Sequence, residues 1–441
     1  MSDAYSHNAV WRIAAPMIIS SVTVPLLGMV DTAVMGHLED PIFLAAVAVG
    51  ATIFSVLFMG LNFLRMGTTG ITAQGFGARD NDTVREALGQ SVITALTLAA
   101  IIIVIQPLLA STALALLSPS EQVATLTLDY FRIRVWSAPA SLCNFALIGW
   151  LIGMQNARGP LAIMLVTNLI NIVLDLAFVV WLGMDVDGVA LATLIAEFCG
   201  LAAGVVIVRA ELARHPGSGT PIRLFVLARY RRLFDVNASL FVRTMALMFV
   251  FAFVTAQGAR MGDIILAVNA LLMNFQLFLA YALDGIAYSA EALVGKAIGG
   301  RDRDGMLLAV RRTLQWSLLF ASGFCAFYLV AGGWIIDLMS DIETLRATAR
   351  DYLPWLIISP LISVWSFLYD GVFVGATRSK EMMFIMVGSL LFVFLPTWFG
   401  FAQFGNHGLW LAFTLFMAAR GAGMHFWFKR LVSSGTLITN G

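Results

Sequence analysis

The chain has 441 residues, of which 60% are hydrophobic and only 12% are charged, and its mean hydropathy is +0.87. This composition excludes a soluble globular protein and predicts a membrane protein that crosses the bilayer many times. The formal net charge is only +1, and we expect no nucleic-acid partner.

Apolar runs of about 20 residues are long enough to span a bilayer as helices. They predict an all-α membrane protein with twelve transmembrane helices. The predicted spans cover residues 10–36, 42–64, 91–117, 130–154, 160–183, 188–209, 237–258, 263–288, 307–333, 352–376, 382–403 and 406–428.

The loops after every second span are rich in arginine and lysine, whereas the other loops are mostly acidic. The loop after residues 188–209 alone contains Arg209, Arg214, Arg223, Arg229, Arg231 and Arg232. By the positive-inside rule, this pattern places both termini in the cytoplasm.

The first predicted span contains an acid, Asp31, shortly after Pro25. A carboxylate deep in a bilayer costs roughly 2.5 to 3.5 kcal/mol on the mildest scale, so an acid kept there typically binds an ion, a proton or a substrate. Pro25 removes one backbone hydrogen bond, which predicts a hinge in the same helix.

The two halves of the chain are copies of one unit. The offset that places Arg79 and Asp80 on Arg301 and Asp302 also places Gly149 on Gly371, far along the chain. We call this constant offset the repeat register. Because each copy has six spans, both start on the same side of the membrane, so the repeat is parallel.

This repeat divides the chain into an N-terminal lobe at 1–209, a cytoplasmic linker at 210–236 and a C-terminal lobe at 237–441. We expect two pseudo-symmetric six-helix lobes around a central cleft that binds the substrate. Such a design needs only a monomer in the lipid bilayer.

Polar residues gather in the later spans of the first lobe. Thr167, Asn171 and Asp175 recur at every fourth position and therefore share one helix face. Further polar candidates nearby are Asn144, Asn168, Thr193 and Glu197. With Asp31 they predict a site where acids share a proton, because desolvation and mutual repulsion oppose full ionisation. The alternative is that these side chains only join neighbouring helices by hydrogen bonds.

The second lobe has Phe253, Val393 and Thr397 where the first has Asp31, Asn171 and Asp175. Its own acids are elsewhere, at Asp284, Glu291 and Asp370. Pairing of these acids with Lys296 or Arg378 is at least as good an interpretation as a role in transport.

The sequence has no nucleotide-binding loop and no hydrolase or metalloprotease motif, so we expect neither an enzyme nor a metal site. Transport must then draw on an ion gradient, unless solutes pass downhill or a partner protein supplies the energy, and no cofactor is needed. A channel or a purely structural membrane protein is a third class, but it has no need of buried acids in one lobe.

Several segments resemble the multidrug and toxic compound extrusion (MATE) transporters, most of all their DNA-damage-inducible (DinF-type) bacterial branch. The resemblance covers nearly the whole chain. The segments are WRIAAPMIISSVTVPLLGMVDTAVMGHL, GITAQGFGARD, WSAPASLCNFALIGWLIGMQNARGP, TNLINIVLD and LDGIAYSAEALVGKAIGGRD.

This resemblance implies an antiporter of the bacterial inner membrane that exports small cationic or amphipathic drugs by alternating access. It also implies that the two six-helix lobes form a V-shaped cleft. In the proton-coupled branch the coupling site corresponds to Asp31, Asn171 and Asp175, joined by Thr193, and the first helix bends at the proline that is Pro25 here.

The resemblance also leaves two other functions open. In the often sodium-coupled branch, the ion site corresponds best to Asp370, near Asp284. A flippase for lipid-linked sugars, in the wider superfamily, calls for an arginine-rich cleft, and most arginines here lie in predicted loops.

Overall fold

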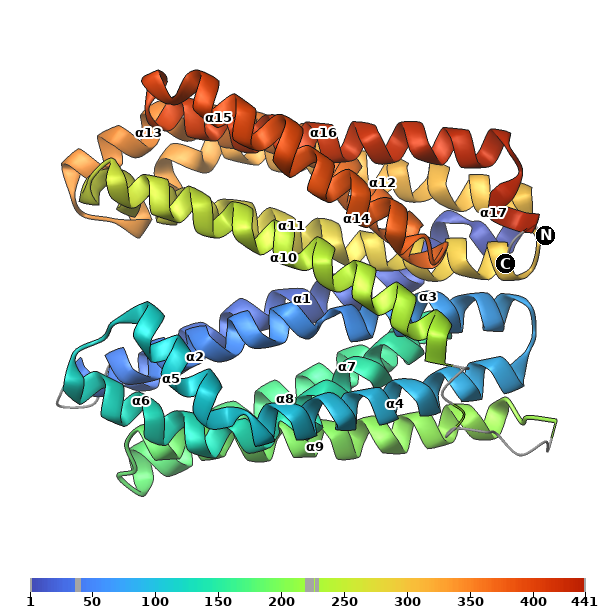
Figure 1. Ribbon diagram of the computed structural model, residues 1–441, viewed down its shortest axis with the longest axis horizontal. Helices are drawn as coiled ribbons and strands as arrows, with labels where there is room; N and C mark the ends of the chain where they lie inside the picture. The colour runs from blue at the N-terminus through green and yellow to red at the C-terminus, as the bar shows by residue number, and fades with distance from the viewer. Residues whose placement is uncertain (1, 36–40, 219–225, 227–229, 440–441) are drawn as a thin grey trace. The chain divides into compact units, whose positions relative to one another are not determined.

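The computed structural model describes residues 2–35, 41–218, 226 and 230–439, and only the backbone within residues 2–3, 24–35, 41 and 438–439. The regular structure of these residues is helical (Figure 1). Ten of the described helical segments are long and apolar enough to cross a membrane. This confirms the predicted all-α membrane fold. Residues 10–35 and 406–428, which fall in two further predicted spans, are helical but are not among those ten, so the number twelve remains a prediction.

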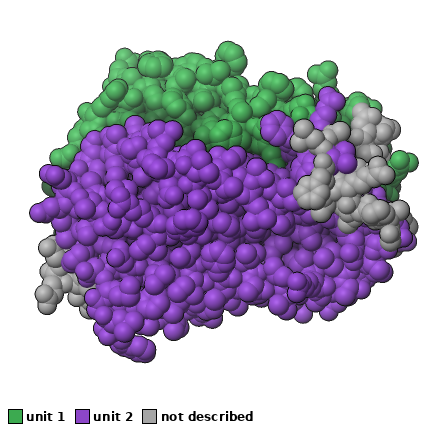
Figure 2. All heavy atoms as spheres, turned by 60° about the horizontal axis from the view of Figure 1, so that its bottom comes forward, with its two compact units in different colours: residues 1–18, 235–441 green, residues 19–234 purple. Residues whose placement is uncertain are grey.

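The chain forms two compact units, coloured separately in Figure 2. We call residues 19–234 the N-unit, and residues 1–18 with 235–441 the C-unit. Residues 2–18 pack with the second half of the sequence, and the predicted lobe boundaries remain a prediction.

The N-unit contains most of α1 and the helices up to α9. Their bounds are α1 (His7–Met35), α2 (Pro41–Leu61), α3 (Phe63–Gly77), α4 (Asn81–Val104), α5 (Gln106–Leu117), α6 (Glu121–Arg134), η2 (Val135–Ser137), α7 (Ala138–Gly153), α8 (Arg158–Asp175), η3 (Leu176–Trp181) and α9 (Val186–Arg214). Helix α7 lies at the centre of the unit, packed against α3, α4 and α9. Its Trp150 is fully buried and donates a hydrogen bond to the Val84 carbonyl at 2.9 Å.

The C-unit contains a short amino-terminal turn and the helices from α10 onward. Their bounds are η1 (Ser2–Tyr5), α10 (Arg231–Arg260), α11 (Asp263–Gly299), α12 (Arg303–Met339), α13 (Glu343–Gly375), α14 (Ser379–Ser389), η5 (Leu390–Phe394), α15 (Leu395–Phe401), η6 (Ala402–Phe404), α16 (Asn406–Ser433) and α17 (Thr436–Thr439). Helix α13 takes the central place, packed against α11, α12 and α16.

The helix bounds follow the repeat register. Helices α2 and α3 together cover the same stretch as the single helix α11, α4 and α5 correspond to α12, and α6 to α7 correspond to α13. Two of the N-unit breaks precede Pro107 and Pro139, which cannot donate the next helical hydrogen bond. The C-unit has Leu329 and Leu361 at these positions, and α12 and α13 continue through them, although α13 also contains Pro354 and Pro360.

Close helix packing is repeated in both units. A Cβ atom on Gly149 of α7 would lie 2.4 Å from the Arg65 carbonyl oxygen of α3, and one on Gly371 of α13 would lie 2.5 Å from the Ala287 carbonyl oxygen of α11. Arg65 and Ala287 are themselves equivalent positions in the repeat register. Only glycine lets the two backbones approach this closely, as at small-residue interfaces of other membrane helices.

The turn before α4 is repeated before α12. Arg79 and Arg301 have left-handed backbones, with φ of 56° and 53°. The next residues, Asp80 and Asp302, each accept a hydrogen bond from the backbone N–H three residues on, at 3.0 and 2.8 Å. These N-caps stabilise both helix starts by about 1 kcal/mol each.

Two helices begin in one unit and continue in the other. Residues 7–18 of α1 are part of the C-unit, where Trp316 of α12 donates a hydrogen bond to His7 at 3.0 Å and Trp11 packs edge-on against the same indole. Residues 231–234 of α10 are part of the N-unit, where Arg232 donates to Gln74 at 2.5 Å.

Helices extend into the predicted linker at 210–236 from both sides, since α9 continues to Arg214 and α10 begins at Arg231. The first residues of this predicted linker contact the start of α4. Arg85 donates to the Leu212 and His215 carbonyls at 2.8 and 3.2 Å, and Asp82 accepts from the Ser218 backbone at 2.9 Å.

Candidate functional site

The predicted polar face of α8 is present in the N-unit. Asp175 is fully buried and Asn171 is 1% exposed, while Thr167 and Asn168 are half-buried. Asp175 ends the α-helix, and the wider π-helical turns of η3 follow it at once. Such π-helical turns are frequent at functional sites.

Helix α9 contributes Thr193 to this face. The Asn171 amide donates a hydrogen bond to the Thr193 hydroxyl at 3.2 Å, and that hydroxyl donates to the Val189 carbonyl at 3.0 Å. The hydroxyl therefore uses its proton within α9 and offers a lone pair to α8, which orients the Asn171 side chain.

The Thr193 hydroxyl can be tested by a Thr193→Val substitution, which leaves the Asn171 amide without this acceptor. Losing one such hydrogen bond costs about 1 kcal/mol, and we expect the initial transport rate to fall about fivefold. Uptake of a fluorescent drug into proteoliposomes measures it. Thr125→Val is the matched control, because the exposed Thr125 hydroxyl bonds only to its own helix, and its rate should not change.

A second polar group lies further along α9. The Asn144 amide of α7 donates to the backbone oxygen and to the side-chain carboxylate of Glu197, at 3.2 and 3.1 Å. The Thr167 hydroxyl donates to the Ile163 carbonyl at 3.0 Å, and a Cβ on Gly200 would lie 2.1 Å from it. Sequence analysis missed Gly200, which makes room for Thr167 between α8 and α9.

Arg134 of α6 was missed by the sequence analysis as well. It interacts electrostatically with Glu197 and lies over the Phe54 ring, at 5.2 Å from the ring centre. The only signal in the sequence is a charge within the predicted span at 130–154. Glu197 therefore has both an amide donor and a cation close by. This arrangement fits the alternative interpretation, in which Glu197 joins neighbouring helices.

The amino-terminal candidates lie on α1. Asn168 of α8 donates to Thr23 at 2.9 Å, which fixes the position of α1 just before Pro25. The side chains of Pro25 and Asp31 lie outside the described residues. The hinge and the meeting of Asp31 with Asp175 therefore remain predictions.

Asp370 of the C-unit pairs with two arginines that the sequence analysis did not name. Asp370 of α13 accepts hydrogen bonds at one carboxylate oxygen from Arg243 of α10 and from Arg420 of α16, the latter at 2.9 Å. The expected partner Arg378 instead contacts Glu381 at 3.5 Å and the Thr436 carbonyl at 2.9 Å. Arg243 and Arg420 do lie inside predicted spans, but no local spacing connects them to Asp370.

The remaining C-unit candidates lie on α11. Glu291 is 3% exposed, and Asp284 is half-buried and interacts electrostatically with Arg420. Asp284 thus belongs to the charge cluster around Asp370.

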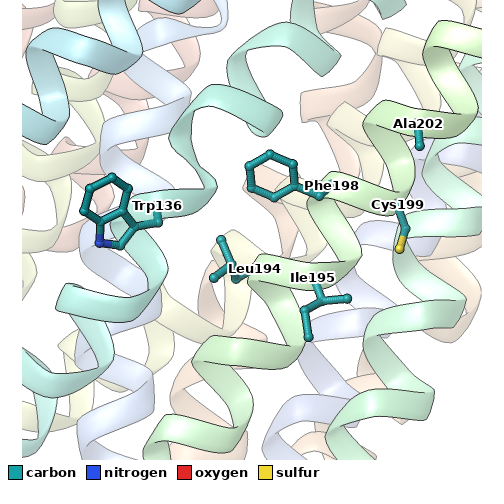
Figure 3. Close-up of a pocket in the computed structure, with 6 residues that line it drawn as sticks. All are labelled: Trp136, Leu194, Ile195, Phe198, Cys199 and Ala202. Atoms are coloured by element: carbon teal, nitrogen blue, oxygen red, sulfur yellow. The ribbon is translucent and has the colours of Figure 1, made fainter.

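A shallow apolar groove runs along the N-unit (Figure 3). Five of its lining residues come from α9 and one, Trp136, comes from η2. They are Trp136, Leu194, Ile195, Phe198, Cys199 and Ala202. The groove offers no charged group, and Trp136 and Phe198 are exposed, as expected for a surface that faces lipid.

The chain was compared with known proteins. The MatE family model matches residues 16–177 and 240–399, one match in each half. DNA damage-inducible protein F of Escherichia coli is 43% identical over 98% of this chain and 94% of its own length. The multidrug resistance protein NorM of Vibrio cholerae is 25% identical over 92% of each chain.

Solved structures share the fold at lower sequence identity. A crystal structure of MATE in the bent conformation matches with a TM-score of 0.87 and 19% identity, over 98% of this chain and 97% of that one. The outward-facing structure of a multidrug resistance MATE family transporter also has a TM-score of 0.87 and 19% identity, over 97% and 96% of the two chains.

Proposed function

The chain belongs to the MatE family, and from this premise we propose that it exports small cationic or amphipathic drugs from a bacterium in exchange for protons. The similarity to a multidrug resistance protein supports the export of drugs. We also propose a monomer in the inner membrane with both termini in the cytoplasm, as the arginine distribution favours.

The observation that supports proton coupling is the fully buried Asp175, which ends the polar face of α8 beside the Asn171–Thr193 hydrogen bond. A buried carboxyl can take up a proton and so lose its charge, which is costly in a membrane interior. The other interior carboxylate with a sodium-coupled counterpart, Asp370, already accepts hydrogen bonds from two arginines.

The mechanism we propose starts with protons binding to Asp31 and Asp175 in an outward-open state. Helix α1 then bends at Pro25, the drug leaves, and the protein returns to an inward-open state. Protons can drive this switch only if they bind the two states with different affinities. Coupling follows because the proton and the cationic drug compete for the same carboxylates.

The test is made with purified protein in sodium-free proteoliposomes that hold a pH gradient. Ethidium, a cationic fluorescent drug, should collapse the gradient, and empty vesicles should retain it. Ethidium movement that requires a sodium gradient would establish the sodium-coupled alternative. If neither gradient moves ethidium or a second, amphipathic drug, the proposal of a drug exporter is wrong.

A further inference from the structure

The C-unit contains a buried charge cluster formed by four helices. Asp370 of α13 lies between Arg243 of α10 and Arg420 of α16, and both arginines donate to the same carboxylate oxygen. Arg243 and Arg420 are 7% and 4% exposed. Asp284 of α11 adds a second negative charge that acts on Arg420.

The charges of this cluster balance without any added ion. A guanidinium keeps its charge at any physiological pH, so Arg243 and Arg420 are permanent cations. With Asp370 and Asp284 ionised, the cluster has two positive and two negative charges. The negative charge that a small cation would need is therefore already compensated by the protein.

The cluster is specific to the C-unit. At the equivalent positions of the repeat register the N-unit has Ser21, Ile148 and Phe198, which are uncharged. Three positions on three different helices thus differ between the two copies, and the C-unit residues at these positions contact one another. A duplication alone leaves both copies alike, so this cluster is a distinct feature of one copy.

We propose that Arg243 and Arg420 determine ion specificity, because they occupy Asp370 as built-in cations and keep sodium out of the C-unit. This inference rests on the proposed function in assigning ion exchange to the N-unit acids. A sodium ion at Asp370 would lie about 4 Å from each guanidinium, and one such repulsion weakens binding about 1000-fold at the effective dielectric constant of a protein interior.

The proposal is tested by removing the two arginines that donate to the Asp370 carboxylate. In the double variant Arg243→Gln/Arg420→Gln, Asp370 loses both cations while amide donors remain on α10 and α16. The melting temperature in detergent is compared in sodium chloride and in choline chloride at equal ionic strength. We expect sodium to raise the melting temperature of this variant by about 2 °C, and to leave the wild type unchanged.

The matched control is the triple variant Arg243→Gln/Asp370→Asn/Arg420→Gln, which differs only in the carboxylate and should show no sodium effect. A folded double variant without a sodium effect would overturn the proposal. A sodium effect in the wild type that is lost in the triple variant would also overturn it. A wild-type effect lost instead in Asp175→Asn would refute proton coupling in the N-unit and leave sodium exclusion from the C-unit standing.

Removing both arginines can prevent folding, so a second variant makes all four residues of the cluster apolar: Arg243→Met/Asp284→Leu/Asp370→Leu/Arg420→Met. Replacing a complete buried ion cluster by apolar residues of similar size is often neutral for stability. We expect this variant to keep sodium-independent, drug-induced collapse of a pH gradient. If the folded variant loses that activity, the cluster takes part in coupling and the proposal is wrong.

Discussion

Replacing Asp175 by asparagine is expected to remove most of the exchange of drug for protons while leaving the protein folded. The amide has the same size as the carboxyl but cannot take up or release a proton. Coupling free energies between two ligands are typically about 1 to 3 kcal/mol, so we expect the drug-induced proton flux to fall about 100-fold. Dye-reported pH in proteoliposomes measures this flux.

Asp175→Asn should remain folded, because the neutral amide has the same size as the carboxyl and costs less to bury than a carboxylate. Asp341→Asn is the control, since the Asp341 side chain is fully exposed and its removal should not change the flux. If Asp175→Asn keeps full proton exchange, the N-unit site does not couple transport to protons. Asp31→Asn should behave as Asp175→Asn does.

Replacing Gly149 by alanine is expected to destabilise the protein by about 3 kcal/mol. Alanine favours a helix by about 1 kcal/mol over glycine, but its Cβ would lie 2.4 Å from the Arg65 carbonyl oxygen. Backbone atoms cannot move aside without shifting α3 relative to α7, so the clash outweighs the helix propensity. The melting temperature in detergent and the yield of monodisperse protein report the effect.

Gly371→Ala should have the same effect in the C-unit, because the added Cβ meets the Ala287 carbonyl oxygen. Gly323→Ala and Gly388→Ala are the controls, since nothing lies within 4 Å of a Cβ at either position. These two should be neutral or slightly stabilising. Equal melting temperatures for Gly149→Ala and Gly323→Ala would show that α3 and α7 separate at little cost.

The fold was predictable because two signals, hydropathy and the internal repeat, extend over the whole sequence. Hydropathy alone located the apolar helical segments to within a few turns, and the repeat register predicted equivalent positions such as Arg79 and Arg301, which share the same backbone conformation. The helix ends were less predictable, since α11 continues to Gly299, well beyond the predicted end at 288. Polar residues extend helices past the bilayer, where hydropathy gives no signal.

The part of the candidate site that lies on one helix face was predictable. The regular spacing along the helix placed Asn171 and Asp175 together, and Thr193 does contact Asn171. The partners of Asp370 were not predictable in this way, because Arg243 and Arg420 are distant in sequence and no local pattern says which helices pack together. Charges inside predicted spans are a usable signal for such clusters, since a charge within the membrane requires a partner.

The division of α1 between the two units has a consequence for biosynthesis. The first residues of α1 are part of the C-unit and contact α12. There His7 accepts a hydrogen bond from Trp316, which lies far along the sequence. At about 5 to 20 residues per second, roughly 15 to 60 s separate the synthesis of these two side chains. The first residues of α1 can therefore reach their final packing in the C-unit only after the ribosome has synthesised α12.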